Sequence, residues 1–379
     1  MSLAASLADA QAMRHADREL LSLALMQSRN GTLAWLALLE RLPEAHSMAG
    51  HIGWWQERWI ARNLQRARGP AAATLHAALA SIEPRADDWW STAMPSAPAP
   101  GIDILRAYLA ETLELTLDLL AHADDSDHGL HWFRAALFEE DAQILAFAAL
   151  AQAHRVVPGG LLPERVLRPV REPLWFAAQT WPLGSAPGGY VPANEQWAHD
   201  EAVPAFEIDA QPVTWQQFAE FVADGGYDDP ARWSAEGRAW LERDGRRTPR
   251  DVEQLRHGVM LQRFGALVRA PMGEAASMLT WHEADAWCRW AGRRLPTEVE
   301  WELAASRGAS RGVGWGQVPE WTAGRARAWP GGAVEDSAAL RVQRGLAWFE
   351  PRRLAHPKAR RFVAAERDDG FAGFRSCAV

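Results

Sequence analysis

Residues 281–305 constrain the fold more than any other part of this chain. The first half of the stretch is rich in tryptophan, and its apolar residues recur at three- and four-residue spacing, which places them on one face of a helix. These residues are Trp281, Ala284, Trp287, Cys288 and Ala291. Gly292 suits the left-handed position that ends a helix. Pro296 and Thr297 then open a second helix, with Thr297 as its N-cap and Glu300 as the capping-box partner. The stretch therefore predicts two helices joined by a tight turn.

The length and composition of the chain limit the classes of protein it can belong to. Its 379 residues, 48% of them hydrophobic, can bury a large core and suffice for two domains. No apolar run reaches the roughly 18 residues that a membrane span needs, so we expect no membrane partner. The net charge of −8 comes from interspersed acids and bases, which gives no reason to expect a nucleic-acid partner.

Cysteine usage and the charged start of the chain indicate a cytoplasmic protein. Cys288 and Cys377 are its only cysteines, so disulfides do not hold the fold together and a reducing cytoplasm fits. Charges near the N-terminus do not fit a secretory leader. They are Asp9, Arg14, His15, Asp17 and Arg18. The 21 tryptophans should mostly pack in the core and between domains, and a few could wall a site for an aromatic ligand.

Residues 1–156 are predicted to form a helical bundle. Long apolar patterns run over 20–42, 51–67, 102–123 and 131–154, and four helices of this length suggest an up-down arrangement. The proline-rich segment 90–101 is expected to link the second helix to the third.

A change in amino-acid composition marks the junction between two predicted domains. Residues 157–192 are rich in proline, glycine and tryptophan, and short strand-like and helical pieces with many glycines follow over 193–379. Residues 205–208 and 212–214 are predicted as strands. The fold class expected for the whole chain is α+β, with a helical bundle followed by a compact domain with little regular structure.

Several blocks of the second half resemble the formylglycine-generating-enzyme-like domain, which has a C-type-lectin-like fold. The blocks are 190–199, 213–222, 225–230, 233–241, 281–305, 320–322 and 371–377. The first half resembles the DinB-like four-helix bundle that precedes this domain in ergothioneine sulfoxide synthases, on residues 51–59 and 133–152. Residues 258–264 and 366–375 look closest to the selenoneine synthase branch of that family.

The resemblance implies a mononuclear non-haem Fe(II) held by three histidines, two of them four residues apart on one helix face. His51 stands at the first position, whereas Glu139 and Gln143 replace the other two histidines. A carboxylate suits Fe(II), but a neutral amide is a weaker ligand, so this set should bind iron less tightly than three imidazoles. His128 and His131 are the alternative ligands. On the residues alone, a lone histidine such as His51 is more often a hydrogen-bonded structural residue, and residues 139–141 are by default a solvated acidic turn of a helix.

The resemblance also implies hercynine as a substrate. Its trimethylammonium group suits aromatic faces, and its carboxylate suits a guanidinium. The family's substrate-binding positions correspond to Arg361, Phe362 and Arg367, although the family's Asn and Asp are absent there. Arg361 and Arg367 are equally compatible with surface cations beside Asp368 and Asp369. No catalytic proton donor can be assigned, because Tyr190 and Tyr227 lie in blocks that look structural.

The leading functional hypothesis is an O2-using non-haem-iron enzyme. It would join a selenosugar or thiol donor to the imidazole carbon of hercynine, in selenoneine- or ergothioneine-type biosynthesis. The alternative is a non-catalytic protein that binds hercynine or a protein partner on the same scaffold. A copper-dependent formylglycine-generating oxidase is a third hypothesis, but it needs two cysteines close together near the C-terminus, and Cys377 has no neighbour in the sequence.

Overall fold

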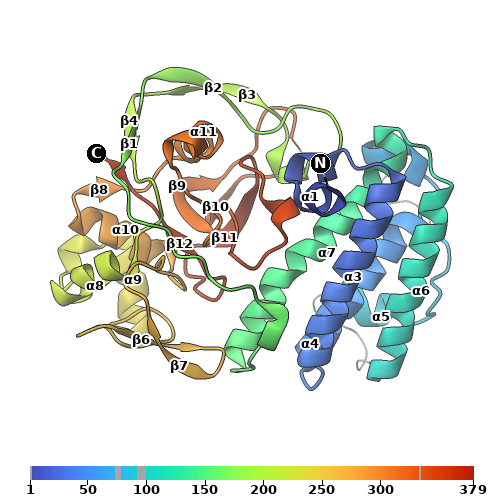
Figure 1. Ribbon diagram of the computed structural model, residues 1–379, viewed down its shortest axis with the longest axis horizontal. Helices are drawn as coiled ribbons and strands as arrows, with labels where there is room; N and C mark the ends of the chain where they lie inside the picture. The colour runs from blue at the N-terminus through green and yellow to red at the C-terminus, as the bar shows by residue number, and fades with distance from the viewer. Residues whose placement is uncertain (1, 73–77, 92–99, 333) are drawn as a thin grey trace.

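The computed structural model describes residues 2–72, 78–91, 100–332 and 334–379. Its first half is helical (Figure 1). The helices are α1 (Leu3–Ala8), α2 (Ala10–Arg14), α3 (Arg18–Leu38), α4 (Pro43–Gln56), α5 (Ala86–Trp90), α6 (Ile102–Ala121) and α7 (Asp127–Ala153). Helices α3, α4, α6 and α7 pack against one another as a bundle, which confirms the four long helices that the sequence predicts. The predicted linker over 90–101 falls largely outside the described residues.

Helix α4 is the second of the four long helices, and its bounds differ from the predicted 51–67. It begins at Pro43, whose fixed φ suits the first helical turn, and ends at Gln56. A wider π-type turn (η1, Glu57–Ala61) follows it. The buried Glu57 carboxylate of this turn accepts hydrogen bonds from the Tyr108 hydroxyl and the Ile82 N–H, each at 2.7 Å. Tertiary hydrogen bonding therefore shapes the end of this segment, and helical periodicity alone does not reveal it.

The second half consists of short strands and helices, as an α+β domain with little regular structure should. Its helices are α8 (Trp215–Ala223), α9 (Ala235–Asp244), α10 (Trp281–Trp290) and α11 (Glu298–Arg307). Its strands are β1 (Leu174–Phe176), β2 (Gln179–Leu183), β3 (His199–Val203), β4 (Phe206–Ile208), β5 (Val252–Gln254), β6 (Val259–Arg263), β7 (Ala266–Ala270), β8 (Arg293–Arg294), β9 (Glu320–Ala326), β10 (Ser337–Arg344), β11 (Arg360–Ala364), β12 (Gly373–Phe374) and β13 (Cys377–Ala378).

The described strands form four small sheets, with strand orders β1-β4-β13-β8, β11-β10-β9-β12, β2-β3 and β5-β6-β7. Strand β4 confirms the strand predicted over 205–208. The strand predicted over 212–214 is reduced to an isolated bridge between Thr214 and Ala275, because Thr214 is already the N-cap of α8. The Thr214 side chain and Gln217 form a reciprocal capping box, which fixes the start of the helix at this point.

The helix pair predicted over 281–305 is confirmed. Trp281, Ala284, Trp287 and Cys288 are buried on one face of α10, and Gly292 has a φ of +64°. Thr297 caps α11 with Glu300 as its capping-box partner. Local signals of capping and periodicity therefore determine this element.

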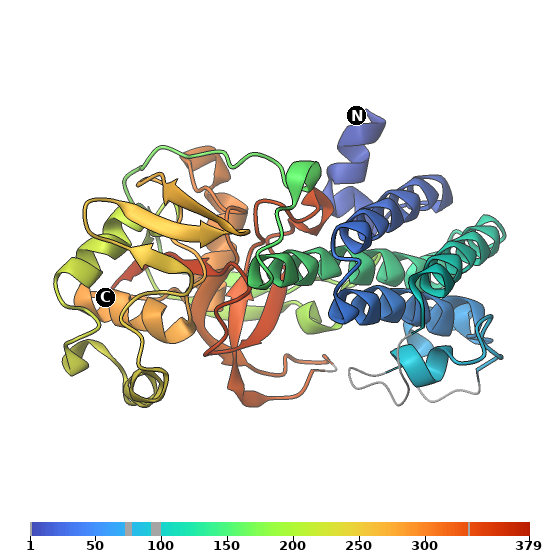
Figure 2. The same cartoon turned by 90° about the horizontal axis from the view of Figure 1, so that it is seen from below.

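The two halves share a hydrophobic core. Trp35, Ile144 and Phe147 of the bundle cluster with Phe349 and Phe371 of the second half. Figure 2 shows α7 lying along the boundary between the bundle and the strand-rich half. Polar contacts cross the same boundary, since the Gln152 side chain donates to Asp251 at 2.9 Å and accepts from the Phe264 N–H at 2.7 Å.

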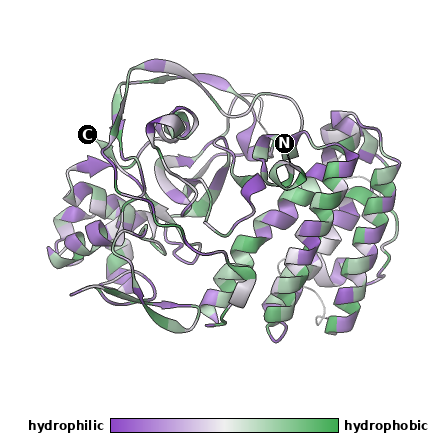
Figure 3. Cartoon of the chain, viewed as in Figure 1, coloured by the Kyte–Doolittle hydropathy of each residue, from purple (hydrophilic) through white to green (hydrophobic). Residues whose placement is uncertain are grey.

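Burial accounts for most of the aromatic content. Trp90, Trp215, Trp233, Trp301 and Trp321 are among the largest fully buried side chains. Polar and apolar residues alternate along the bundle helices (Figure 3). Within the described ranges, no helix combines the length and the apolar character that crossing a membrane requires.

Candidate functional site

His51 is held in one orientation by the backbone of a neighbouring segment. It lies on α4, and its Nδ1 is 2.8 Å from the carbonyl oxygen of Trp90. Because a carbonyl can only accept, Nδ1 carries the proton and donates it, which leaves a lone pair on Nε2 of the neutral ring. The ring also stacks on Trp54, with centroids 5.5 Å apart. A ring fixed through one nitrogen by a backbone carbonyl is the usual arrangement of a metal-binding histidine.

Glu139 lies on α7, which packs against α4. Its side chain is exposed, and in the described residues it makes no hydrogen bond or ion pair. Partial desolvation of this exposed side chain raises the pKa of its carboxyl, whereas the charge of His51 opposes the rise. His51 and Glu139 therefore belong to one electrostatic site, although they come from different helices.

Gln143 follows Glu139 by one helical turn, which places both side chains on one face of α7. Its side chain is partly buried and has no hydrogen-bond partner among the residues described. Within those same residues, no group of three or more His, Cys, Asp or Glu side chains is placed to hold a metal ion. A metal here would therefore need the amide oxygen of Gln143 or another neutral donor beside His51 and Glu139.

The alternative ligands lie toward the start of α7. His128 is exposed in the first turn of the helix. His131 packs edge-on against Trp132, with centroids 4.9 Å apart. Burial and, after it, the charges of Arg134 and His128 lower the pKa of His131 to about 4. A neutral imidazole at this position keeps a lone pair for a ligand or a hydrogen-bond donor.

Tyr190 is the residue that sequence reasoning missed. Its ring packs against Phe138 and His131, with centroid distances of 5.1 and 5.6 Å. Burial raises the pKa of its hydroxyl, and the charge of Glu139 adds to this effect. Tyr190 therefore lies beside the Glu139 site. No local pattern reveals this proximity, because the two residues belong to different halves of the chain. By contrast, the Tyr227 hydroxyl donates to buried Glu283 at 2.6 Å, which is a structural role.

The predicted substrate-binding residues occupy separate environments. Arg361 of β11 bonds the fully buried Glu350, with one contact at 3.1 Å, and does not pair with Asp368 or Asp369. Phe362, the next residue of the same strand, lies under the guanidinium of Arg360 at 4.5 Å.

Arg367 is exposed and pairs with Asp369 at 2.5 Å, as expected of a surface cation. No described contact joins Arg361, Phe362 or Arg367 to His51 or Glu139.

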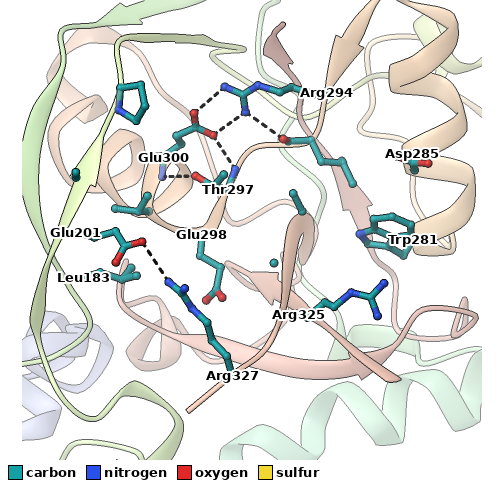
Figure 4. Close-up of a pocket in the computed structure, with 16 residues that line it drawn as sticks. Leu183, Glu201, Trp281, Asp285, Arg294, Thr297, Glu298, Glu300, Arg325 and Arg327 are labelled. Atoms are coloured by element: carbon teal, nitrogen blue, oxygen red, sulfur yellow. Dashed lines mark hydrogen bonds and ion pairs between the residues drawn. The ribbon is translucent and has the colours of Figure 1, made fainter. Parts of the chain in front are cut away.

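A cavity of about 660 Å³ lies within the second half, and neither His51 nor Glu139 is among its lining residues (Figure 4). Its charged groups are already paired. Arg294 bonds Glu300 at 2.7 Å, and Arg327 lies 3.4 Å from Glu201. The wall therefore offers little uncompensated charge with which to select a ligand.

Both cysteines are buried and free. Burial raises the pKa of Cys288 and of Cys377, so both stay protonated thiols at neutral pH.

Comparisons with known proteins give two kinds of relatives. Residues 180–314 match the family described as "Sulfatase-modifying factor enzyme 1-like domain". The chain is 38% identical over 149 residues to the hercynine oxygenase of Mycolicibacterium smegmatis, a match that covers 39% of this chain and 31% of the relative. It is 32% identical over 187 residues to the formylglycine-generating enzyme of Streptomyces coelicolor, covering 45% of this chain and 58% of the relative.

Among solved structures, PvdO from Pseudomonas aeruginosa aligns with a TM-score of 0.36 and 18% identity over 54% of this chain and 93% of that one. The chain spans about a third of the length of the hercynine oxygenases that it matches, 31% in the first case. These findings confirm a formylglycine-generating-enzyme-like segment in the second half, built of mixed helix and sheet. Part of the chain is also similar to hercynine oxygenases.

Proposed function

We propose that this protein is a non-haem-iron oxygenase that joins a sulfur or selenium donor to the imidazole carbon of hercynine. The similarity to hercynine oxygenases supports an oxidoreductase that acts on a hercynine-related substrate. The observation that carries the proposal is that the charge of His51 on α4 acts on the Glu139 carboxyl on α7. One is a histidine fixed through Nδ1, and the other is a carboxylate without a partner in the described chain.

His51, Glu139 and Gln143 would hold the iron. An imidazole nitrogen, a carboxylate and an amide oxygen are all donors that Fe(II) accepts, and the residues present therefore fit this metal. Bound iron would supply the one-electron chemistry needed to use O2. The chain itself keeps His51 in the tautomer that presents Nε2, through the Trp90 carbonyl. The buried hydroxyl of Tyr190, with its raised pKa, would stay protonated beside Glu139 and serve as a hydrogen-bond donor.

Hercynine recognition needs an aromatic face for its trimethylammonium group and a cation for its carboxylate. Arg361, Phe362 and Arg367 remain our proposal for these roles. Arg361 would have to exchange or share its bond with Glu350, and Arg367 its bond with Asp369. The selenosugar or thiol donor and O2 are the co-substrates that the proposed reaction requires.

Replacement of Glu139 tests the proposed metal site. Glu139→Ala should abolish both iron retention and turnover, because it removes the only anionic ligand of the set. Iron content after anaerobic reconstitution with Fe(II), and O2 uptake with hercynine and a thiol, measure the two effects. Glu114→Ala is the matched control, since Glu114 is an exposed carboxylate of α6 outside the proposed set. Unchanged iron content in Glu139→Ala would refute the assignment.

One observation favours a second candidate function, a non-catalytic hercynine-binding protein. Gln143 is a weak metal ligand, and no third imidazole or carboxylate completes the set within the described chain. In such a protein, Glu139→Ala would leave hercynine affinity almost unchanged, and added iron would cause no O2 uptake.

A further inference from the structure

A second group of charged residues lies where the segment after α7 runs past β6 and β7 on its way to β1 (Figure 1). Arg165 of this segment and Arg263 of β6 both bond the carboxylate of Glu274. They line a cavity of about 550 Å³, a volume within the usual range of small-molecule sites. Arg165 also lines two small adjoining cavities.

The charges of this cluster do not balance. The Nη2 of Arg263 is 2.5 Å from Oε1 of Glu274, and Nη1 of Arg165 bonds the same oxygen. The three side chains are only 16%, 22% and 5% exposed for Arg165, Arg263 and Glu274. Two guanidinium groups therefore share one carboxylate, which leaves one positive charge largely screened from water. The buried Nε of Arg165 has no hydrogen-bond partner among the described residues.

Electrostatics agree with this geometry. Burial and, after it, the charge of Arg263 lower the pKa of Arg165 to about 9. Glu274 opposes both effects without cancelling them. Glu164 lines the same cavity, but its side chain is exposed and makes no described ion pair with either arginine.

The rest of the cavity wall is largely apolar. The guanidinium of Arg165 stacks on Trp348, 3.5 Å from the ring centroid, which fixes its plane. Leu162, Leu167 and Val268 line the same groove, and Leu167 is 50% exposed. These contacts distinguish Arg165 from an isolated surface arginine, which is surrounded by water. Apolar walls beside an uncompensated pair of guanidinium groups suit a ligand with an anionic end and an apolar body.

We propose that this groove binds a small organic carboxylate with an apolar body. Its carboxylate would bridge Arg165 and Arg263 and complete the charge balance, and its body would pack against Trp348, Leu162 and Val268. The fixed fork geometry of arginine favours a planar carboxylate. This groove shares no lining residue with the proposed iron site, so the proposal does not depend on the proposed function.

Calorimetric titration of the full chain with 3-phenylpropionate tests the proposal, with 3-phenylpropanol and acetate as the neutral and the body-less comparison ligands. We expect 3-phenylpropionate to bind at least about tenfold more tightly than either, because only it has both the charge and the apolar body. Equal binding of the alcohol would overturn the proposal, as would equal binding of acetate or no binding of 3-phenylpropionate.

Three variants locate the site. Arg263→Gln should weaken 3-phenylpropionate binding by at least about tenfold, since it removes one charged donor. Arg256→Gln is the matched control, because Arg256 is exposed near the same strands and does not line the cavity. Ala266→Trp adds a side chain at an exposed lining position, and should block the groove while leaving both arginines in place. Binding that survives Arg263→Gln and Ala266→Trp, in proteins with wild-type melting temperatures, would refute the assignment.

Discussion

Glu139 combines exposure to solvent with a carboxyl pKa that the surrounding protein raises. An exposed carboxylate can be solvated by water, whereas a buried one is normally satisfied by an arginine. The next residue shows this arrangement, since Glu140 accepts from Nε of Arg29 at 2.8 Å. Glu139 has no such partner within the described residues, and the charge that acts on it is that of His51 on α4. The two adjacent carboxylates therefore differ, because Glu140 is fixed inside the bundle by Arg29, whereas Glu139 is exposed and open to a ligand.

Gln143→His tests the ligand set from the opposite direction. Imidazole is a better donor for Fe(II) than an amide, so this change should tighten iron binding by about tenfold or more. Anaerobic titration with Fe(II) measures the effect. Gln143→Leu is the control, because a leucine side chain is similar in size to glutamine and has no atom that can bind a metal. If Gln143→His binds iron no more tightly than Gln143→Leu, position 143 does not face the metal.

At the scale of elements, two helices begin with the same type of capping box, but the pKa values of the two capping glutamates shift in opposite directions. Glu283 in α10 is fully buried, and burial raises the pKa of its carboxyl to about 7. Burial also acts on Glu300 in α11, but hydrogen bonds from Arg294 and Thr297 outweigh it and lower its pKa. The same sequence signature therefore gives two helix starts with different responses to pH.

The raised pKa of Glu283 predicts a pH dependence of stability. The folded state binds this proton more tightly than the unfolded chain, so the stability it contributes is complete below the usual value of 4.5 and is lost as pH rises through about 7. Glu283→Gln should therefore raise the free energy of unfolding at pH 8 by about 1–3 kcal/mol relative to wild type, and much less at pH 4. Urea unfolding at the two pH values measures this difference.

Glu300→Gln serves as the control for Glu283→Gln, and its effect should have the opposite sign. The lowered pKa of Glu300 stabilises the fold at neutral pH, and this contribution is lost as pH falls. Its loss should therefore destabilise the protein at pH 8. A variant of Glu283 that is less stable than wild type at pH 8 would contradict the account.

Elements with strong local signals could be predicted from the sequence, and tertiary features could not. The helix pair over 281–305 follows from its apolar spacing and its capping residues. The predicted strand over 212–214 is reduced to an isolated bridge because the capping box of Thr214 and Gln217 starts a helix there. His51 and Glu139 were predicted from the resemblance to a family. The position of Tyr190 beside Glu139 depends on packing between distant parts of the chain, which the sequence does not reveal. The predicted division into 1–156, 157–192 and 193–379 stays a prediction.

At the scale of the whole molecule, the two halves are joined by buried charges as well as by the shared core. Arg353, in the turn that follows β10, donates to Asp141 of α7 at 2.8 Å and to Gln27 of α3 at 2.7 Å. Asp141 is 1% exposed and Arg353 4% exposed. This pair therefore connects the strand-rich half to the helix that carries Glu139.

Removal of Arg353 should destabilise the whole protein. Arg353→Leu would leave the Asp141 carboxylate buried without its cation, which typically costs about 3–5 kcal/mol. Arg352→Leu is the adjacent control, since Arg352 is exposed and has no ion pair among the described residues. Chemical unfolding followed by circular dichroism measures both. Equal effects of the two variants would show that the connection between the halves does not depend on this pair.

Anaerobic titration of the wild-type protein with Fe(II), with and without hercynine, tests the central claim most directly. Oxygen uptake is then followed after addition of a thiol or a selenosugar. The account predicts that the chain binds iron through the site of His51, Glu139 and Gln143, and that oxygen uptake depends on both iron and hercynine. Hercynine binding that remains intact in a protein that binds no iron would contradict the oxygenase and leave the non-catalytic binding protein.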